Sequence, residues 1–258
     1  MPCLKDCPEL LQLQELIRKK PVAIYLVGGA PRDLLLGRQG RDFDFAVSQD
    51  AIPLARAFAR KIKGAFVLLD AETGCARVAK KKDGQLWTFD LADFRAPTFR
   101  RDLKKRDFTI NTLAVNFRHL TDAEQISAKI IPDKKAKADL KARVLRMVSA
   151  KAFVDDPLRL LRAYSLMAQL GFKIDPATQK AIRAQVKLIA KASPERVREE
   201  FFKILESPRA AATLKAMYKD GILFEVIPQL RVMEKVHQGG YHHLDVWRHS
   251  LEMVSQLE

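Results

Sequence analysis

The sequence predicts an α+β protein in which a small mixed β-sheet domain is followed by an all-helical neck and body. Three observations carry this prediction. Short apolar runs separated by turns recur between Ile24 and Ala92, which is typical of strands. From Thr121 onwards, apolar residues recur at helical spacing. The 258 residues, 48% of them hydrophobic, are enough to form one large or two to three small cores.

The first part of the chain contains the elements of the sheet and its helices. Helical periodicity from Cys7 to Lys19 ends at Pro21, and Ile24-Val27 reads as a buried strand that breaks at Gly28-Gly29. We expect further strands over residues 42–45, 66–70, 75–79 and 86–92, a short helix over 31–36 and an amphipathic helix over 52–63.

The second part is expected to be helical. We expect helices over residues 139–148, 176–192 and 194–205, and further helices from 207 to 258. The predicted domains are a head over 1–119, a helical neck over 120–206 and the start of a helical body over 207–258. We expect the chain to end within its last helix, as a truncated chain would.

The formal net charge of +15 and the pI near 9.8 indicate a polyanionic partner, with nucleic acid as the first candidate. Residues 95–151 hold 15 Lys and Arg against 6 Asp and Glu, so the basic character is concentrated there. The alternative is a lysine-rich solvated surface.

Three cysteines, Cys3, Cys7 and Cys75, do not make a disulfide framework. The sequence shows neither a secretory signal nor an apolar run of transmembrane length, so we expect a cytoplasmic protein without a membrane partner. Cys3 and Cys7 are interpreted as structural or incidental thiols, because no second pair of metal ligands accompanies them.

The stretch from Tyr25 to Phe45 holds the strongest candidates for chemistry. Gly28 and Gly29 let backbone N–H groups approach an anion such as a triphosphate, although such a pair is also found in ordinary turns. Asp42 and Asp44 alternate along a strand and therefore share one face. Two such acids are typical ligands of Mg²⁺ together with substrate phosphates, and the alternative is a solvated strand edge.

Taken together, the strand, Gly28-Gly29, Arg32-Asp33, Leu-Leu-Gly-Arg and Asp42-x-Asp44 resemble the motif of DNA polymerase β-type nucleotidyltransferases. More narrowly, they are similar to class II tRNA nucleotidyltransferases (CCA-adding enzymes) and bacterial poly(A) polymerases. The resemblance implies a nucleotidyltransferase head, or catalytic palm, in which Gly28, Gly29 and Arg32 hold the triphosphate and Asp42 and Asp44 bind Mg²⁺. Asp90 matches the third acidic position of the wider superfamily and is a further catalytic candidate.

Residues 102–114, DLKKRDFTINTLA, resemble the family's RRDFTINA motif, with Lys105 in place of the first arginine. This resemblance implies that Arg106 contacts the incoming nucleotide and that Asp107 and Asn111 read its ribose. Without that context, the segment is an amphipathic one with a capping Asp.

Only six residues separate Arg95 from Asp102. Complete CCA-adding enzymes generally carry a longer flexible loop here, and enzymes that add only CC resemble this chain in lacking it. The short connector therefore favours CC addition.

Asp156, Arg159 and Arg162 follow at i, i+3 and i+6 and share a helical face. An Asp and an Arg on one face can imitate a complementary base: the carboxylate accepts from the amino group of cytosine or adenine, and the guanidinium donates to the ring. In the alternative, Asp156 is an N-cap before Pro157. The segment resembles the family's EDxxR motif, with Asp155 replacing Glu, which implies that Asp156 and Arg159 select the nucleotide. Arg162 is then expected to contact the same pocket or the phosphates.

Two further segments resemble parts of the family. The SPERVREEFFKIL segment from Ser193 resembles the fifth motif, which we interpret as stabilising the neck. Tyr241 to His249 resembles the entrance to an HD-type helical region, but no complete His-Asp dyad follows.

The sequence thus predicts a template-independent, Mg²⁺-dependent RNA nucleotidyltransferase that adds C and/or A to the tRNA 3′ end from CTP and/or ATP, with tRNA as its partner. A poly(A) polymerase, an A-adding enzyme and a full CCA-adding enzyme are the alternatives within this chemistry. A non-catalytic module that binds RNA or nucleotides is the alternative from a different class.

Overall fold

A computed structural model describes residues 7–18, 20–38, 40–119, 130–131, 134–234, 236 and 244–257. The chain forms two compact units, Met1–Leu140 and Lys141–Glu258. The first unit contains a mixed sheet with helices, and the second is built mainly from helices, so the predicted α+β class is confirmed. The predicted domain boundaries after residues 119 and 206 stay predictions.

The first unit is organised around a sheet whose described strands lie in the order β3-β4-β5-β2-β1-β6. Its strands are β1 (Ile24–Val27), β2 (Asp42–Val47), β3 (Ala65–Asp70), β4 (Cys75–Lys82), β5 (Gln85–Asp93) and β6 (Val115–Asn116). The strand β2 runs parallel to β5, and the other neighbours are antiparallel. The expected strands over the head are therefore confirmed, with most of them extended by one to three residues.

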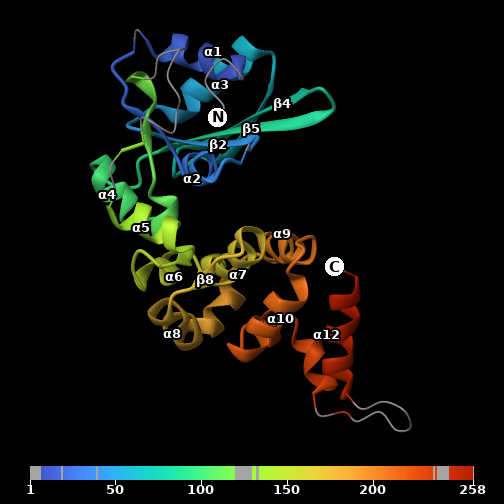
Figure 1. The fold of residues 1–258 in the computed structure, drawn as a ribbon. Helices are drawn as coiled ribbons and strands as arrows, with labels where there is room; N and C mark the ends of the chain where they lie inside the picture. The colour runs from blue at the N-terminus through green and yellow to red at the C-terminus, as the bar shows by residue number, and fades with distance from the viewer. Residues whose placement is uncertain are drawn as a thin grey trace. The chain divides into compact units, whose positions relative to one another are not determined.

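The described α-helices of this unit are α1 (Pro8–Ile17), α2 (Gly29–Leu35), α3 (Ala51–Ile62) and α4 (Phe99–Leu103), and α5 (Lys134–Ala142) continues into the second unit. In Figure 1, α1 and α3 lie on one side of the sheet and α2 lies on the other. The fully buried ring of Phe58 on α3 meets the ring of Phe89 on β5 edge to face, with centroids 5.3 Å apart. Apolar burial of this kind fixes which face of the sheet is the core face.

Strand register divides the sheet into two chemically different faces. Phe45 pairs with Leu91 and lies on the core face with Phe89, whereas Asp44 pairs with Asp90. Because partners in register point to the same face and neighbours along a strand alternate, Asp42, Asp44 and Asp90 share the face opposite the core. The predicted separation of carboxylates and rings along β2 is thus present.

The second unit is built from α6 (Lys151–Asp155), α7 (Leu158–Leu170), α8 (Pro176–Gln185), α9 (Pro194–Leu205), α10 (Ala210–Lys219), α11 (Leu223–Val226) and α12 (Val246–Gln256). The helix α7 packs against α9 and α10 and buries Tyr164, whose hydroxyl donates to the buried Asp220 carboxylate at 2.7 Å. Buried polar groups of this kind are tolerated because they are hydrogen-bonded.

One predicted helix is wrong. We expected a helix from Asp139 to Val148, but α5 ends at Ala142 because Arg143 takes the left-handed conformation with φ of 57°. Val144–Leu145 then form β7, which pairs in parallel with β8 (Lys173–Ile174). The helical part of the chain therefore contains a small two-stranded sheet that the sequence did not indicate.

Short 3₁₀ helices complete the described chain: Thr109–Asn111, Phe117–His119, Val186–Lys191 and Pro228–Met233. The expected helix over 176–192 is thus an α-helix that continues as a 3₁₀ helix. In the described part of the chain, no helix is both long and apolar enough to cross a membrane. Tyr241, His242 and His243 of the histidine segment lie outside the described residues.

Candidate active site

The two acids of the first motif lie beside the glycine turn. Val27 pairs with Asp44 across β1 and β2, so the turn that follows β1 begins next to this carboxylate. Gly28 has φ of +75°, and a Cβ atom built on it would lie 2.6 Å from Asp44 Oδ2. Only glycine suits this position, because any side chain would be strained in the backbone and would collide with the carboxylate.

The third acid of this face is held by a guanidinium. Arg77 on β4 pairs in register with Asp90 on β5, and its Nε and Nη2 donate to the two carboxylate oxygens at 2.7 and 2.8 Å. These hydrogen bonds raise the pKa of Arg77, and the charges of Asp42 and Asp44 raise it further. Asp42 differs, because its Oδ1 accepts a hydrogen bond from the neutral hydroxyl of Thr88.

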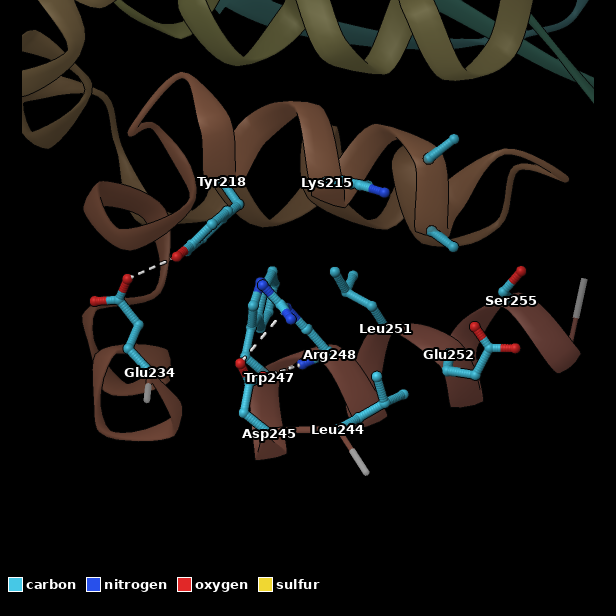
Figure 2. A pocket seen from close by; sticks show the side chains of 12 residues that line it. Lys215, Tyr218, Glu234, Leu244, Asp245, Trp247, Arg248, Leu251, Glu252 and Ser255 are labelled. Atoms are coloured by element: carbon cyan, nitrogen blue, oxygen red, sulfur yellow. Dashed lines mark hydrogen bonds and ion pairs between the residues drawn. The ribbon is translucent and has the colours of Figure 1, made fainter. Parts of the chain in front are cut away.

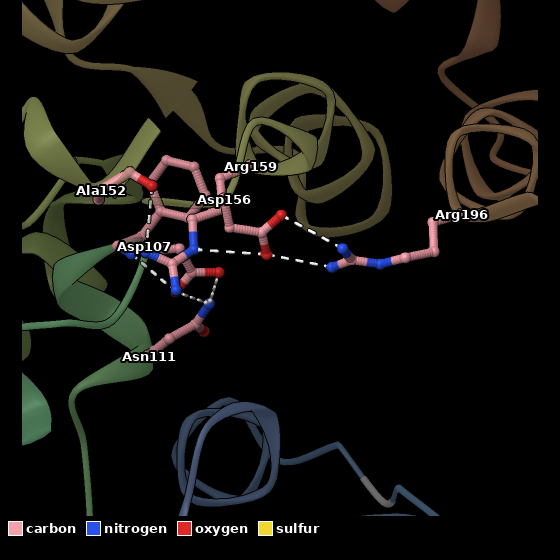
Figure 3. Close-up of polar contacts among 7 residues, drawn as sticks. Asp107, Asn111, Ala152, Asp156, Arg159 and Arg196 are labelled. Atoms are coloured by element: carbon pink, nitrogen blue, oxygen red, sulfur yellow. Dashed lines mark hydrogen bonds and ion pairs between the residues drawn. The ribbon is translucent and has the colours of Figure 1, made fainter. Parts of the chain in front are cut away.

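The first and second motifs are joined by a buried polar network. Arg32 donates from Nε and Nη2 to Asp33 at 2.9 and 3.0 Å, and from Nη1 to Asn111 Oδ1 at 2.8 Å. Asn111 in turn donates from Nδ2 to both carboxylate oxygens of Asp107, at 3.0 and 3.2 Å (Figure 3). Arg32, Asp107 and Asn111 are all buried, so the orientation of each polar group is fixed by the others.

Arg106 is a buried cation whose hydrogen bonding is incomplete. Its side chain is 13% exposed and its Nη2 lies 3.4 Å from Asp102 Oδ2. Its Nε is buried and has no hydrogen-bond partner among the residues that the structure describes. Burial lowers the pKa of this guanidinium, and the Asp102 carboxylate opposes that shift. A buried donor without a partner is expected where a ligand supplies the acceptor.

The connector between Arg95 and Asp102 is held at Asp102 and at Phe99. Asp102 is 2% exposed, and its Oδ1 accepts from the backbone N–H of Arg95 at 2.9 Å. Phe99 stacks on Tyr25 of β1 with ring centroids 3.6 Å apart and planes 7° apart. One carboxylate thus ties both ends of the connector together, and one ring fixes it to the sheet.

In the second unit, Asp156 lies between α6 and α7 and faces two arginines (Figure 3). Its Oδ2 lies 3.8 Å from Nε of Arg159 and 3.0 Å from Nη2 of Arg196, a residue of α9. Asp156 has extended backbone just before the helical Pro157, the position of an N-cap. Its carboxylate is directed to the two arginines instead of to a backbone N–H at the start of α7. Arg159 is 9% exposed, and Arg162, one turn further on, is exposed.

A cavity of about 870 Å³ lies elsewhere in the second unit, between α10 and α12. Tyr218, Trp247 and Arg248 line it, and Figure 2 shows Tyr218 joined to Glu234 by a hydrogen bond of 2.9 Å. The cavity contains none of the residues that the sequence indicates for catalysis or nucleotide binding.

Comparison with known proteins identifies two regions of the chain. Residues 24–146 match the family described as "Poly A polymerase head domain", and residues 171–233 match that described as "Probable RNA and SrmB- binding site of polymerase A". The chain belongs to the tRNA nucleotidyltransferase and poly(A) polymerase family. The predicted family is thereby confirmed.

Relatives within this family carry different names. The chain is 40% identical over 205 residues to the CC-adding tRNA nucleotidyltransferase of Synechocystis sp., covering 79% of this chain and 46% of the relative. It is 37% identical over 243 residues to the A-adding tRNA nucleotidyltransferase of Deinococcus radiodurans, covering 92% of this chain and 52% of the relative. This chain therefore spans about half the length of these curated relatives.

A solved structure of this family has a similar fold. It is titled "Thermotoga maritima CCA-adding enzyme complexed with tRNA_CCA", and the two chains are 27% identical with a TM-score of 0.72. The match covers 91% of this chain and 54% of that one.

The residues on the acidic face suit the divalent ion that this family generally uses. Asp42 and Asp44 offer two carboxylates on one face of β2, and carboxylate oxygens are the ligands that Mg²⁺ prefers. No group of three or more His, Cys, Asp or Glu residues gathers as a metal site among the described residues. Two protein carboxylates fit a Mg²⁺ ion that takes its other ligands from phosphates and water.

Sequence reasoning missed Arg77, Thr88 and Arg196. Arg77 could have been found, because the Asp83-Gly84 turn places Lys82 opposite Gln85 and so fixes Arg77 opposite Asp90. Thr88 contacts Asp42 across the parallel strands β2 and β5, whose register no tight turn fixes. The contact of Arg196 with Asp156 joins residues 40 positions apart and depends on how α7 and α9 pack, for which the sequence carries no signal.

Proposed function

We propose that this protein is a Mg²⁺-dependent, template-independent nucleotidyltransferase that adds C and/or A to the 3′ end of tRNA, and that CC addition is its activity. The arrangement on the acidic face of the head carries the proposal. Asp42 and Asp44 share this face, and Asp44 lies against the Gly28 turn. Family membership supports the same chemistry.

In the proposed reaction, the 3′ oxygen of the RNA attacks the α-phosphorus of CTP or ATP. A new O–P bond forms, the bond between the α-phosphorus and the bridging oxygen breaks, and pyrophosphate leaves in line with the attack. The 3′ hydroxyl gives its proton to solvent water in this step. Bound magnesium would supply charge neutralisation at the attacking and leaving oxygens, with Asp42 and Asp44 as its protein ligands.

The phosphates require cationic and N–H donors from the head. Arg106 is a suitable donor, because it is buried, only loosely paired with Asp102 and has an Nε without a hydrogen-bond partner in the described chain. Gly28 and Gly29 allow the backbone to come close to the triphosphate, and Arg32 borders the same turn. We assign ribose recognition to the Asp107–Asn111 pair, which offers both acceptors and donors.

Selection of the base is assigned to the neck. The carboxylate of Asp156 would accept from the amino group of cytosine or adenine, and Arg159 would donate to the ring, with Arg162 near the same pocket or the phosphates. Uracil and guanine present a carbonyl oxygen to the carboxylate, and two acceptors facing one another repel. The protein would thereby take the place of a nucleic-acid template.

Binding of the tRNA acceptor arm is expected to depend on charge. Residues 95–151 carry a surplus of nine positive charges, and duplex RNA is bound mainly through phosphates and shape.

The anchored connector favours CC addition over complete CCA addition. Asp102 and Phe99 fix a segment that is longer and flexible in complete CCA-adding enzymes. If the segment is fixed, the nucleotide pocket cannot readily change its shape from one that accepts CTP to one that accepts ATP. The similarity to an A-adding relative keeps A addition as the second candidate.

The proposal is tested by incubating the protein with tRNA that lacks its last three nucleotides, or only its last one, and with each NTP alone and in mixtures. CC addition predicts growth by two nucleotides with CTP and no further growth when ATP is added. If only the tRNA that ends in CC grows, and does so with ATP, the protein is an A-adding enzyme. Growth of the shorter tRNA by three nucleotides would identify a full CCA-adding enzyme, and a long A tail would identify a poly(A) polymerase. Absence of any incorporation would reject the proposed function.

A further inference from the structure

The carboxylate of Asp156 is held from two sides in the second unit (Figure 3). Arg159, at the start of α7, approaches from one side with Nε 3.8 Å from Oδ2. Arg196, on the first turn of α9, approaches with Nη2 3.0 Å from Oδ2 and Nη1 3.4 Å from Oδ1. The side chains of Asp156 and Arg196 are 29% and 53% exposed, so water screens the charge of this pair and its main effect is on orientation.

The contact with Arg196 fixes the plane of the carboxylate. Two nitrogens of one planar guanidinium face two oxygens of one carboxylate, which is the fork geometry that only arginine offers. Rotation of the Asp156 carboxylate about its Cβ–Cγ bond would lengthen at least one of these contacts. A single positive charge at the same place would not resist that rotation in the same way.

Arg159 itself is fixed by a separate contact. Its Nη1 donates to the backbone carbonyl of Ala152 at 3.2 Å, and the residue is 9% exposed. The carboxylate therefore lies between two guanidinium groups that belong to different helices. A carboxylate has about four lone-pair positions, so pairing with Arg196 leaves acceptor positions for a further donor.

We propose that Arg196 is a specificity-determining positioning residue: it holds the Asp156 carboxylate in the orientation that accepts a base amino group and rejects a base carbonyl. This inference rests on the proposed function, in which Asp156 and Arg159 read the base. Without Arg196, the carboxylate can turn towards Arg159 and form a close i, i+3 pair. Both groups would then be occupied with each other, and discrimination between bases would fall.

The test compares R196A, R196K and, as a matched control, R198A. Arg198 lies on the same helix, is exposed and makes no ion pair with a residue that the structure describes, so its loss removes the same charge without touching Asp156. For each variant, kcat and KM are measured for CTP and UTP on tRNA lacking its last three nucleotides. The preference for CTP is the ratio of the two kcat/KM values.

We expect R196A to lower the preference for CTP about fivefold, because both contacts of the fork are lost but water already screens them. R196K should fall between wild type and R196A, since lysine keeps the charge but not the fork. R198A should keep the wild-type preference. Because CTP and UTP are compared on one preparation, partial unfolding of a variant cancels from the ratio.

The result that overturns the inference is a wild-type preference for CTP in R196A, measured beside a D156A variant that has lost it. Arg196 would then only stabilise the packing of α9. A failure of the proposed function looks different: the wild-type protein would incorporate no nucleotide, or D156A would discriminate as well as wild type. An equal loss of preference in R198A and R196A would also overturn the inference, since it would reflect charge alone.

Discussion

The acids of the head and the acid of the neck are surrounded by different groups. On β2, Asp42 accepts from the hydroxyl of Thr88, and Asp44 lies against the Gly28 turn. In the neck, Asp156 lies between the guanidinium groups of Arg159 and Arg196. The acids of β2 thus lie beside a hydroxyl and a glycine turn, with the charges of Arg77 and Arg106 acting on Asp44, whereas the acid of the neck is paired with two cations.

The difference follows from what each carboxylate is proposed to bind. An acid that holds a divalent ion meets that cation with its negative charge, and a hydroxyl donor such as Thr88 does not neutralise the charge. An acid that accepts a hydrogen bond from a base needs orientation more than charge, and a guanidinium fork supplies orientation. Asp90 combines both situations, because it shares the face of Asp42 and Asp44 but is paired with Arg77.

The largest effect is expected from D42N and D44N. Each substitution keeps the size of the side chain but removes the charge that holds magnesium, so we expect nucleotide incorporation to fall on the order of 10³-fold. Binding of tRNA, measured by filter retention, should change little. This outcome would separate an enzyme from a non-catalytic RNA-binding module, which would show no incorporation before the substitution.

The matched control for this pair is D83N. Asp83 is exposed in the turn between β4 and β5 and has φ of 52°, a conformation that Asn also tolerates. D83N removes one negative charge from the same domain and should keep wild-type activity. If D42N and D44N stayed within a few-fold of D83N, the assignment of the metal site to β2 would be wrong.

A smaller effect is expected from R106A. Loss of a donor to the triphosphate should lower kcat/KM for CTP about 10²-fold. Because phosphates are common to all nucleotides, the preference for CTP over UTP should stay at the wild-type ratio. Substitutions at Asp156 or Arg196 are expected to change the preference for CTP over UTP instead. Substitutions in the head should therefore lower the rate, and substitutions in the neck should lower the selectivity.

The control for Arg106 is R60A, which removes the same charge from an exposed position on α3. R60A should leave kcat/KM for CTP within about threefold of wild type, in keeping with the small effects of exposed charges. Thermal unfolding of R106A is measured in parallel, because Asp102 would lose one partner while keeping the backbone N–H of Arg95. A changed CTP preference in R106A would contradict the division between the two units.

Local patterns predicted most of the head. The strand at Ile24–Val27, the alternation over Asp42–Phe45 and the strands around Asp83-Gly84 depend on nearby residues, and all were found where expected. The helix expected over 139–148 was wrong, because nothing in the sequence marks Arg143 as left-handed. Arginine is uncommon in that conformation, so a sequence pattern does not predict it.

The ion pairs at the candidate site were harder to predict. The pairing of Arg77 with Asp90 follows from the two-residue turn once the strands are assumed, so it was available from local chemistry. The pairing of Asp156 with Arg196 was not available, since helical spacing says nothing about which face of α9 meets α7. The sequence therefore indicated the acidic residues of the site, but not the arginines that orient Asp90 and Asp156.

The smallest effect is expected from separating Arg77 and Asp90. Arg77 is 44% exposed and Asp90 is 21% exposed at their side chains, so water screens the pair. We expect a double-mutant cycle with R77A, D90N and the double variant to give a coupling energy of about 1 kcal/mol by urea unfolding. Because both oxygens of Asp90 are engaged by Arg77, D90N should lower incorporation by about tenfold at most, far less than D42N. A loss in D90N as large as that in D42N would instead make Asp90 a third catalytic acid, and the head would then hold both kinds of carboxylate within one site.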